Sequence, residues 1–231
     1  AQKMFWTREN IIIYHLSCDH YLSQGFGRYD VQANQQLAPF DGKLHGLVLD
    51  ASGNRWYAIT GREYGDENAT PNLLVTGTVN EPTYEVIETA VPVEMIFVGQ
   101  HSGRLYFTAR EQTEAKDISH ETLGSILSPP YFHFYHTQLW TIQPDGSEER
   151  LLWESDDHSY SRVTETREGD LLFVLIENDV ARYEAMTSGV PEAEWPTHYP
   201  HTHIMRLSPN SPEPEIFIED ARDLMVWYPQ K

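Results

Sequence analysis

The chain has 231 residues and carries 35 acidic against 16 basic side chains, a formal net charge of −19 at pH 7. Its 40% hydrophobic and 12% aromatic residues are too many for a disordered chain, and no run reaches the roughly 18 apolar residues of a membrane span. The negative field of such a surface repels phosphate backbones and anionic lipid, so we expect neither nucleic acid nor a membrane as partner.

Cysteine usage and the first residues say little about the compartment. The single cysteine, Cys18, cannot form an internal disulfide, so the fold is not held by one. The sequence shows no signal peptide, and a start at Ala1-Gln2 suits a processed mature chain. The location stays open, with a secreted or periplasmic protein slightly favoured.

Aromatic and β-branched runs bounded by Gly, Asn, Asp and Pro predict an all-β chain, and no long stretch shows a 3.6-residue apolar period. Three segments share one pattern, which is a strand, a tight turn with glycine and an aromatic-rich second strand. They are Leu44–Thr60, Glu94–Thr108 and Arg162–Ile176. Their turn glycines, Gly53, Gly103 and Gly169, suit hairpins that need a positive φ.

Two further strand-like runs follow each hairpin after a loop. They are Leu73–Val79 with Tyr84–Glu88, Gln138–Gln143 with Glu149–Trp153, and His203–Leu207 with Glu215–Ile218. Four antiparallel strands repeated at such intervals are typical of β-propeller blades. We therefore predict blades of four strands over residues 41–90, 91–155 and 156–220.

The two chain ends predict one more blade, because each resembles half of a hairpin. Met225–Lys231 aligns with the inner strand Met95–His101, and Lys3–Thr7 aligns with the second strand Arg104–Thr108.

Residues 1–40 with 221–231 would then complete a four-bladed propeller over residues 1–231. Its ring would close by pairing of the N- and C-terminal strands, which leaves no free sheet edge. A piece of a larger propeller cut at a blade boundary is the alternative, and two small sandwiches are less favoured.

Two segments carry a family resemblance. Leu139–Leu152 (LWTIQPDGSEERLL) and Thr166–Val174 (TREGDLLFV) resemble the outer and inner strands of TolB-like, PD40-type β-propeller repeats. The likeness covers two blades well and the others loosely. Because relatives range from periplasmic scaffolds to oligogalacturonate lyases, it implies the fold far more than the function.

Two of the loops between second and third strands are long, Gln112–Phe134 and Glu177–Pro200. In a propeller such loops lie on the face where the central funnel opens, and compact β proteins usually connect strands with a handful of residues. The two loops favour a binding or catalytic site on that face. Alternatively, they cover blade edges or contact a protein partner.

A repeated arginine marks the ends of the predicted second strands. It occurs in Thr7-Arg8-Glu9, Thr60-Gly61-Arg62-Glu63 and Thr108-Ala109-Arg110-Glu111, and Ile176-Glu177-Asn178 breaks the pattern. In the predicted ring the three guanidinium groups approach one face, where they would bind a carboxylate or sulfate of the substrate. Alternatively, each arginine pairs with a glutamate and holds blades together.

The histidines show a third internal match, an HxxHT motif before two consecutive third strands. It reads His133-Phe-Tyr-His136-Thr137 and His198-Tyr-Pro-His201-Thr202, with His203 next. Such imidazoles suit a divalent metal (zinc, manganese or calcium) or acid and base catalysis near neutral pH. We assign His133, His198 and His203 as metal ligands and His136 and His201 as catalytic, while buried or ring-stacked histidine is the ordinary alternative.

Three further residues lie at the entrances of inner strands, His45, His158 and Tyr160. We expect His45 to bind substrate and His158 or Tyr160 to act as an acid, although a one-residue slip in register moves each to the other sheet face. The sequence has no GxSxG, P-loop, GxGxxG or CxxC motif, so serine hydrolase, nucleotide triphosphatase and dinucleotide chemistry have no support.

Together these residues suit a carbohydrate-active lyase that performs β-elimination on an acidic (uronate) oligosaccharide or polysaccharide. Arg62 and Arg110 or a metal would neutralise the uronate carboxylate, a histidine would remove the neighbouring C–H proton, and Tyr160 or His158 would protonate the leaving oxygen. A non-catalytic propeller that binds a glycan or a protein is nearly as well supported. A glycoside hydrolase with paired carboxylates is a further alternative.

Overall fold

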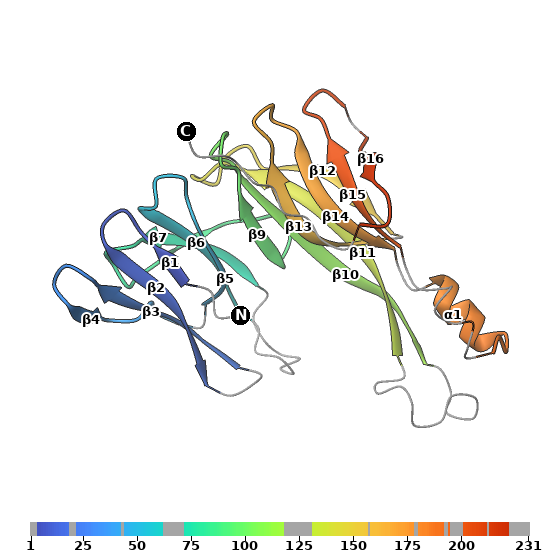
Figure 1. Cartoon of the computed structure of the whole chain (residues 1–231), viewed down its shortest axis with the longest axis horizontal. Coiled ribbons are helices and arrows are strands. Elements are labelled where there is room, and N and C mark those ends of the chain that lie inside the picture. The colour runs from blue at the N-terminus through green and yellow to red at the C-terminus, as the bar shows by residue number, and fades with distance from the viewer. Residues whose placement is uncertain are drawn as a thin grey trace. The chain divides into compact units, whose positions relative to one another are not determined.

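The structure is a computed structural model of the chain, and its described residues form four antiparallel sheets of four strands with one short helix (Figure 1). It describes all residues except 1–3, 19–21, 43, 62–71, 118–130, 157, 178–179, 192–193, 195–200, 212 and 222–231, and only the backbone of 17–18, 22–24, 114–117, 131–133, 158–161 and 182. The all-β, propeller-type prediction is confirmed. Closure of the ring stays a prediction, because the C-terminal segment lies outside the described residues.

The first sheet contains β1 (Met4–Trp6), β2 (Ile11–Cys18), β3 (Leu22–Asp30) and β4 (Gln35–Leu37) in chain order. The prediction placed Lys3–Thr7 as the second strand of its blade. The structure instead gives Met4–Trp6 as the first of four described strands, paired with β2, so this sheet has four strands without the C-terminal segment. The alignment failed because similar apolar and aromatic patterns occur in first and second strands alike.

The second sheet contains β5 (Leu44–Leu49), β6 (Arg55–Thr60), β7 (Leu73–Thr78) and β8 (Glu85–Ile87). Its apolar residues pack against those of the first sheet. The shared buried group comprises Ile11, Ile13, Phe26, Phe40, Leu44, Leu47, Trp56, Ala58, Val75 and Val79. Burial of these side chains is the main stabilising contribution in this part of the chain.

A buried arginine also links the first two sheets. The Arg28 side chain is 2% exposed, and its Nε and Nη1 atoms donate to the carbonyl oxygens of Ala38 at 2.8 Å and Val79 at 3.0 Å. Its guanidinium carbon lies 5.0 Å from the centre of the Phe40 ring. Burial lowers the pKa of Arg28, whereas the nearby Asp41 carboxylate raises it. Arg28 is therefore a structural cation.

The third sheet contains β9 (Met95–Val98), β10 (Leu105–Asp117), β11 (Tyr131–Ile142) and β12 (Arg150–Ser155). Only Leu105–Thr108 of β10 pairs with β9. Beyond that, β10 and β11 continue as a two-stranded hairpin (Figure 1). Much of the predicted loop Gln112–Phe134 is therefore extended strand, and its residues 118–130 lie outside the described part.

The fourth sheet contains β13 (His158–Glu165), β14 (Leu171–Glu177), β15 (Thr202–Leu207) and β16 (Glu215–Ile218). Helix α1 (Val180–Thr187) interrupts the predicted loop Glu177–Pro200. It ends in a Schellman-type cap, because Gly189 has a φ of 81° and the Val190 N–H donates to the Ala185 carbonyl at 3.1 Å. No described helix is long and apolar enough to cross a membrane.

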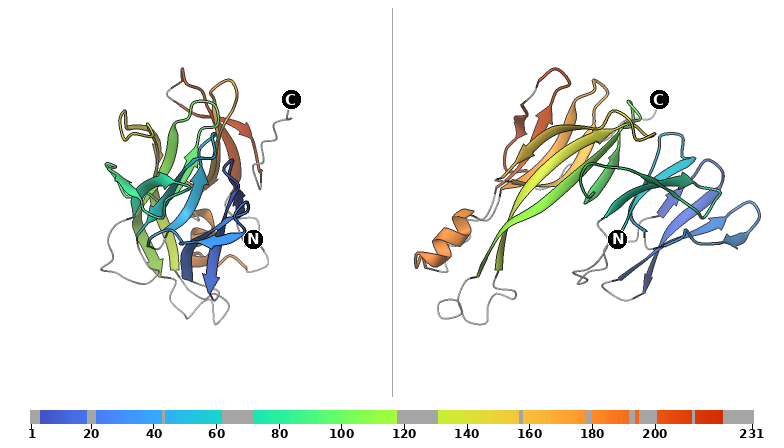
Figure 2. Two further views of the ribbon diagram at one scale, coloured as in Figure 1. Left: turned by 90° about the vertical axis from the view of Figure 1, so that its left-hand side faces the viewer. Right: turned by 180° about the vertical axis from the view of Figure 1, so that it is seen from behind.

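By compactness the chain divides into two units, residues 1–109 with 140–150 and residues 110–139 with 151–231. The paired strands within each sheet remain side by side in both further views (Figure 2). All three predicted hairpins are confirmed as β5–β6, β9–β10 and β13–β14. Their turn glycines have positive φ, which is 71° at Gly53, 71° at Gly103 and 88° at Gly169.

A glycine on a third strand lets an aromatic ring of the second strand lie flat against the backbone. Gly77 pairs with Trp56, whose side chain is fully buried and donates from Nε1 to the Thr78 carbonyl at 2.9 Å. A Cβ built on Gly77 would lie 2.6 Å from Trp56 Cζ2 and 2.8 Å from the Thr83 carbonyl oxygen. This close approach excludes any side chain at Gly77.

We expect Gly77→Ala to lower the free energy of unfolding by about 1–3 kcal/mol, because the added methyl overpacks the buried indole and backbone. Chemical denaturation monitored by tryptophan fluorescence measures the change. Gly103→Asn is the control, since a Cβ there meets nothing within 4 Å and asparagine tolerates a φ of 71°. Equal stability of Gly77→Ala and wild type would contradict the packing argument.

Candidate functional site

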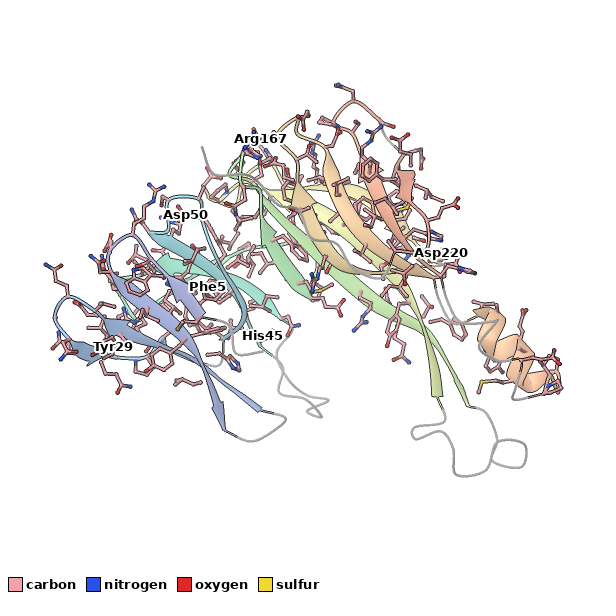
Figure 3. All side chains as sticks on the ribbon, in the orientation of Figure 1. Phe5, Tyr29, His45, Asp50, Arg167 and Asp220 are labelled. Carbon is pink, nitrogen blue, oxygen red and sulfur yellow. The ribbon has the colours of Figure 1, made fainter. Side chains whose placement is uncertain are left out.

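His201 lies between the carboxylates of Asp220 and Glu177 at the start of β15. Its ring Nδ1 is 2.6 Å from Asp220 Oδ1, and its peptide N–H donates to Glu177 Oε2 at 3.1 Å. Asp220 follows β16 at one end of the fourth sheet (Figure 3). The hydrogen bond to Asp220, the charge of Asp220 and the charge of Glu177 together raise the pKa of His201 from its ordinary value of 6.5. The raised pKa makes the imidazole a stronger base.

His203 is the next residue on the same face of β15, because side chains two apart in a strand point the same way. Its ring stacks on that of His201 at a centroid distance of 6.2 Å and an interplanar angle of 17°. Its Nε2 lies 3.6 Å from Glu177 Oε1. The buried Nδ1 atom has no hydrogen-bond partner among the described residues.

The sheet register brings two more predicted residues to this face. His158 pairs with Glu177 and Tyr160 pairs with Leu175, while Leu175 also pairs with His203 on its other side. Residues directly opposite in antiparallel strands belong to one face. His158, Tyr160, His201 and His203 therefore occupy register positions on a single face of β13, β14 and β15, as a shared site requires.

His136 makes a similar arrangement within the third sheet. Its Nδ1 is 2.7 Å from Asp156 Oδ1, and its Nε2 is 3.4 Å from Glu154 Oε2. The Gln138 amide also donates to Glu154 Oε2 at 3.1 Å. In both sheets the second histidine of the HxxHT motif is thus linked to an aspartate that follows the fourth strand, although His136 lies within β11 and His201 directly before β15.

The predicted arginines do not share one environment. Arg8 lies in the turn between β1 and β2, where a Cβ on Gly53 of the β5–β6 turn would be 3.4 Å from its peptide nitrogen. Arg110 lies within β10, with its guanidinium carbon 4.3 Å from the centre of the Tyr135 ring. Among the described strands β1 is the first of its sheet and β10 the second of its own, so the structure does not support the predicted equivalence of Arg8 and Arg110. Arg62 lies outside the described residues.

Arg110 also lies on the opposite sheet face from His136, because it contacts Tyr135 and successive strand residues alternate between faces. His45 is the second residue of β5 and pairs with Ile59. Figure 3 shows it at the opposite end of that strand from Asp50. Burial lowers the pKa of His45, so its neutral form is favoured. His45 and Arg8 belong to the first unit, whereas His136 and His201 belong to the second.

The predicted metal site is not confirmed. Among the residues whose side chains are described, no three His, Cys, Asp or Glu residues converge as cation ligands. His203 is described, but the His133 side chain and all of His198 lie outside that part of the chain. Zinc and manganese bind imidazole and carboxylate groups, so these residue types suit a metal. The described side chains, however, do not form a set of three ligands around one point.

Sequence reasoning did not place any carboxylate against the histidines, whereas the structure places Glu154, Asp156, Glu177 and Asp220 there. Two signals point to them in retrospect. The first signal is an aspartate shortly after each fourth strand, Asp156 after β12 and Asp220 after β16. The second is Glu177, which breaks the arginine repeat at the end of a second strand.

No family model and no curated protein matches the chain. Solved structures do match. A chain of a nidogen/laminin complex has a TM-score of 0.52 at 12% identity, covering 93% of this chain and 62% of that one. An oligogalacturonate lyase in complex with manganese has a TM-score of 0.52 at 13% identity, and the match covers 94% of this chain and 52% of the lyase. A Pyrococcus horikoshii acylaminoacyl peptidase has a TM-score of 0.55 at 14% identity, and the match covers 95% of this chain and 32% of the peptidase.

At these identities the likeness shows the fold alone, and this chain spans between 32% and 62% of the length of the three neighbours. The neighbours are propeller structures, so the likeness to TolB-like propeller repeats is confirmed at the level of the fold.

We expect the pKa of His201, followed by NMR, to fall toward 6.5 in Asp220→Asn, because asparagine removes the charge that favours the imidazolium. A raised pKa stabilises the folded state below the ordinary value, and this contribution is lost as the pH rises through the folded-state pKa. The Asp220→Asn protein should therefore lose stability relative to wild type at acidic pH more than at alkaline pH. Glu215→Gln, which removes the ion pair with Arg206, is the control. An unchanged His201 titration in Asp220→Asn would refute the assigned cause.

Proposed function

We propose that this protein is an oligosaccharide or polysaccharide lyase that cleaves an acidic (uronate) sugar by β-elimination. The observation that supports it best is the duplicated His–Asp pair, His136 with Asp156 and His201 with Asp220. A carboxylate that holds Nδ1 of an imidazole leaves Nε2 as the nitrogen that can accept a proton. Two oligogalacturonate lyases among the structural neighbours support the choice of an acidic sugar.

In this reaction the base removes the proton on the carbon next to the uronate carboxylate. The electrons of that C–H bond form a carbon–carbon double bond, and the bond from the next carbon to the glycosidic oxygen breaks. The oxygen leaves with the bonding pair and takes a proton from an acid. His201 is the proposed base, because its imidazole is more exposed than that of His136, 57% against 25%. Tyr160 or His158 is the proposed acid, since both occupy register positions on the same sheet face.

The proposal also requires a cation, because the described site is acidic. Glu177 and Asp220 flank His201, and their charges oppose the binding of a uronate carboxylate. Arg62 is one source of positive charge, and a divalent metal bound by His133, His198 and His203 is another. A bound metal would neutralise the uronate carboxylate and so acidify the adjacent C–H bond.

A non-catalytic propeller that binds a glycan or a protein is the second candidate. The nidogen/laminin complex matches this chain with the same TM-score as the manganese-bound lyase, so the fold itself does not choose between them. In that case the His–Asp pairs only link a residue of β11, or the residue before β15, to the segment that follows the fourth strand of the same sheet. The acylaminoacyl peptidases match this chain at TM-scores of 0.55 and 0.53, so the fold does not favour the lyases over them either.

We expect the protein to raise the ultraviolet absorbance of an acidic polysaccharide from a panel, as an unsaturated uronate forms. His201→Ala should lower kcat by about 10²–10⁴-fold while ligand affinity is retained, the usual contribution of a general base. His136→Ala, tested separately, shows whether the second pair takes part. Loss of activity with a chelator would support the metal.

A flat absorbance trace over the whole panel would refute the lyase. Retained glycan or protein binding in that case would favour the non-catalytic propeller. Glu215→Gln is the matched control, because its carboxylate pairs with Arg206 near the other end of the β15–β16 hairpin.

A further inference from the structure

We propose that Glu177 and Asp220 are positioning residues that fix His201 so that its Nε2 atom meets the ligand. Only the catalytic consequence of this inference rests on the proposed function. The arrangement itself is a property of the fold and would serve a bound glycan or cation equally.

Asp220 fixes the imidazole. A carboxylate only accepts hydrogen bonds when ionised, so the 2.6 Å contact with Asp220 Oδ1 requires the proton on Nδ1 of His201. In the neutral ring Nε2 is then the atom with the free electron pair. The His201 side chain is 57% exposed, so this atom can reach a ligand.

Glu177 fixes the main chain of the same residue. The Glu177 N–H donates to the His201 carbonyl at 3.0 Å, and Glu177 Oε2 accepts the His201 N–H at 3.1 Å. One residue at the end of β14 thus holds both peptide groups at the start of β15. Such second contacts determine how precisely a functional side chain is placed.

Glu177 also separates the roles of the two stacked histidines. Its Oε1 faces His203 Nε2 at 3.6 Å, and His203 is only 15% exposed. His203 is therefore turned toward Glu177 and packed beneath its neighbour, whereas His201 is exposed. The geometry assigns His201 as the histidine that meets the ligand.

The second sheet shows what the same backbone position looks like without this function. Ile176 pairs with Thr202, and Thr60 pairs with Leu73, so Glu177 and Gly61 are equivalent residues just beyond those pairs. Glycine offers no carboxylate. The carboxylate of Glu177 therefore has no counterpart at Gly61 in the second sheet. In the fourth sheet it contacts both His201 and His203.

The first test is the tautomer of His201 in the intact, ¹⁵N-labelled protein, read from long-range ¹H–¹⁵N correlations at alkaline pH. We expect the proton on Nδ1 in wild type and a shift toward the Nε2–H form or a mixture in Asp220→Ala. Glu215→Gln should leave the spectrum of His201 unchanged. A wild-type His201 with its proton on Nε2, or an Asp220→Ala spectrum identical to wild type, would overturn the inference. If Asp220→Ala does not fold, the wild-type tautomer decides.

The second test is kinetic. Asp220→Ala and Glu177→Ala should lower kcat about 10- to 100-fold with little change in KM, the usual effect of removing a partner that orients a functional histidine. Glu177→Gln should recover part of the loss, because its amide oxygen can still accept the His201 N–H. Full activity in both alanine variants would overturn the inference. A wild type with the expected tautomer but no lyase activity would refute the proposed function and leave the positioning role standing.

Discussion

The site depends on the register of β14 against β15. That register pairs Val174 with Ile204 and Leu175 with His203, and it sets Glu177 beside His201. β14 is buried on both faces, since Phe173, Val174 and Leu175 are each at most 2% exposed. A slip of one residue would exchange the two faces of β15 and place His203 where Ile204 packs. Each buried apolar side chain contributes about 1.5–3 kcal/mol, so the core fixes the register and the register assembles the histidines.

The hairpins could be predicted from sequence because their signals are local. A glycine with positive φ between an apolar and an aromatic strand specifies its turn within a few residues, as at Gly53 and Gly169. The HxxHT repeat was also visible, but its predicted position before the third strand was wrong in the third sheet. The first copy lies within β11, whereas the second ends at Thr202, the first residue of β15. The pairing of His158 and Tyr160 onto the same face as His201 followed from those strand positions.

The rest could not be predicted because it depends on contacts distant in sequence. His136 meets a carboxylate 20 residues away, and His201 meets carboxylates 19 and 24 residues away. Those distances include a turn or a helix whose length no local pattern specifies. Helix α1 has no strong apolar period, and its cap at Gly189 is the only clear signal of where it ends. The place of Lys3–Thr7 in the first sheet was predicted differently for another reason, because first and second strands carry similar apolar and aromatic patterns.

The two HxxHT copies show why an internal repeat does not establish use. His136 faces Asp156 at Nδ1 and Glu154 at Nε2, so both ring nitrogens lie near carboxylates. The residue equivalent to Glu154, two positions before the aspartate, is Ile218 in the fourth sheet, and it cannot contact His201 in that way. The motif is therefore common to both sheets, but the residues around it differ. In the third sheet Glu154 lies beside Nε2 of His136, the atom that would meet a ligand. In the described part of the fourth sheet the equivalent position is Ile218, and Glu177 is added at the His201 backbone. The physical difference between the copies, rather than their likeness, is the reason for proposing His201 and not His136 as the functional histidine.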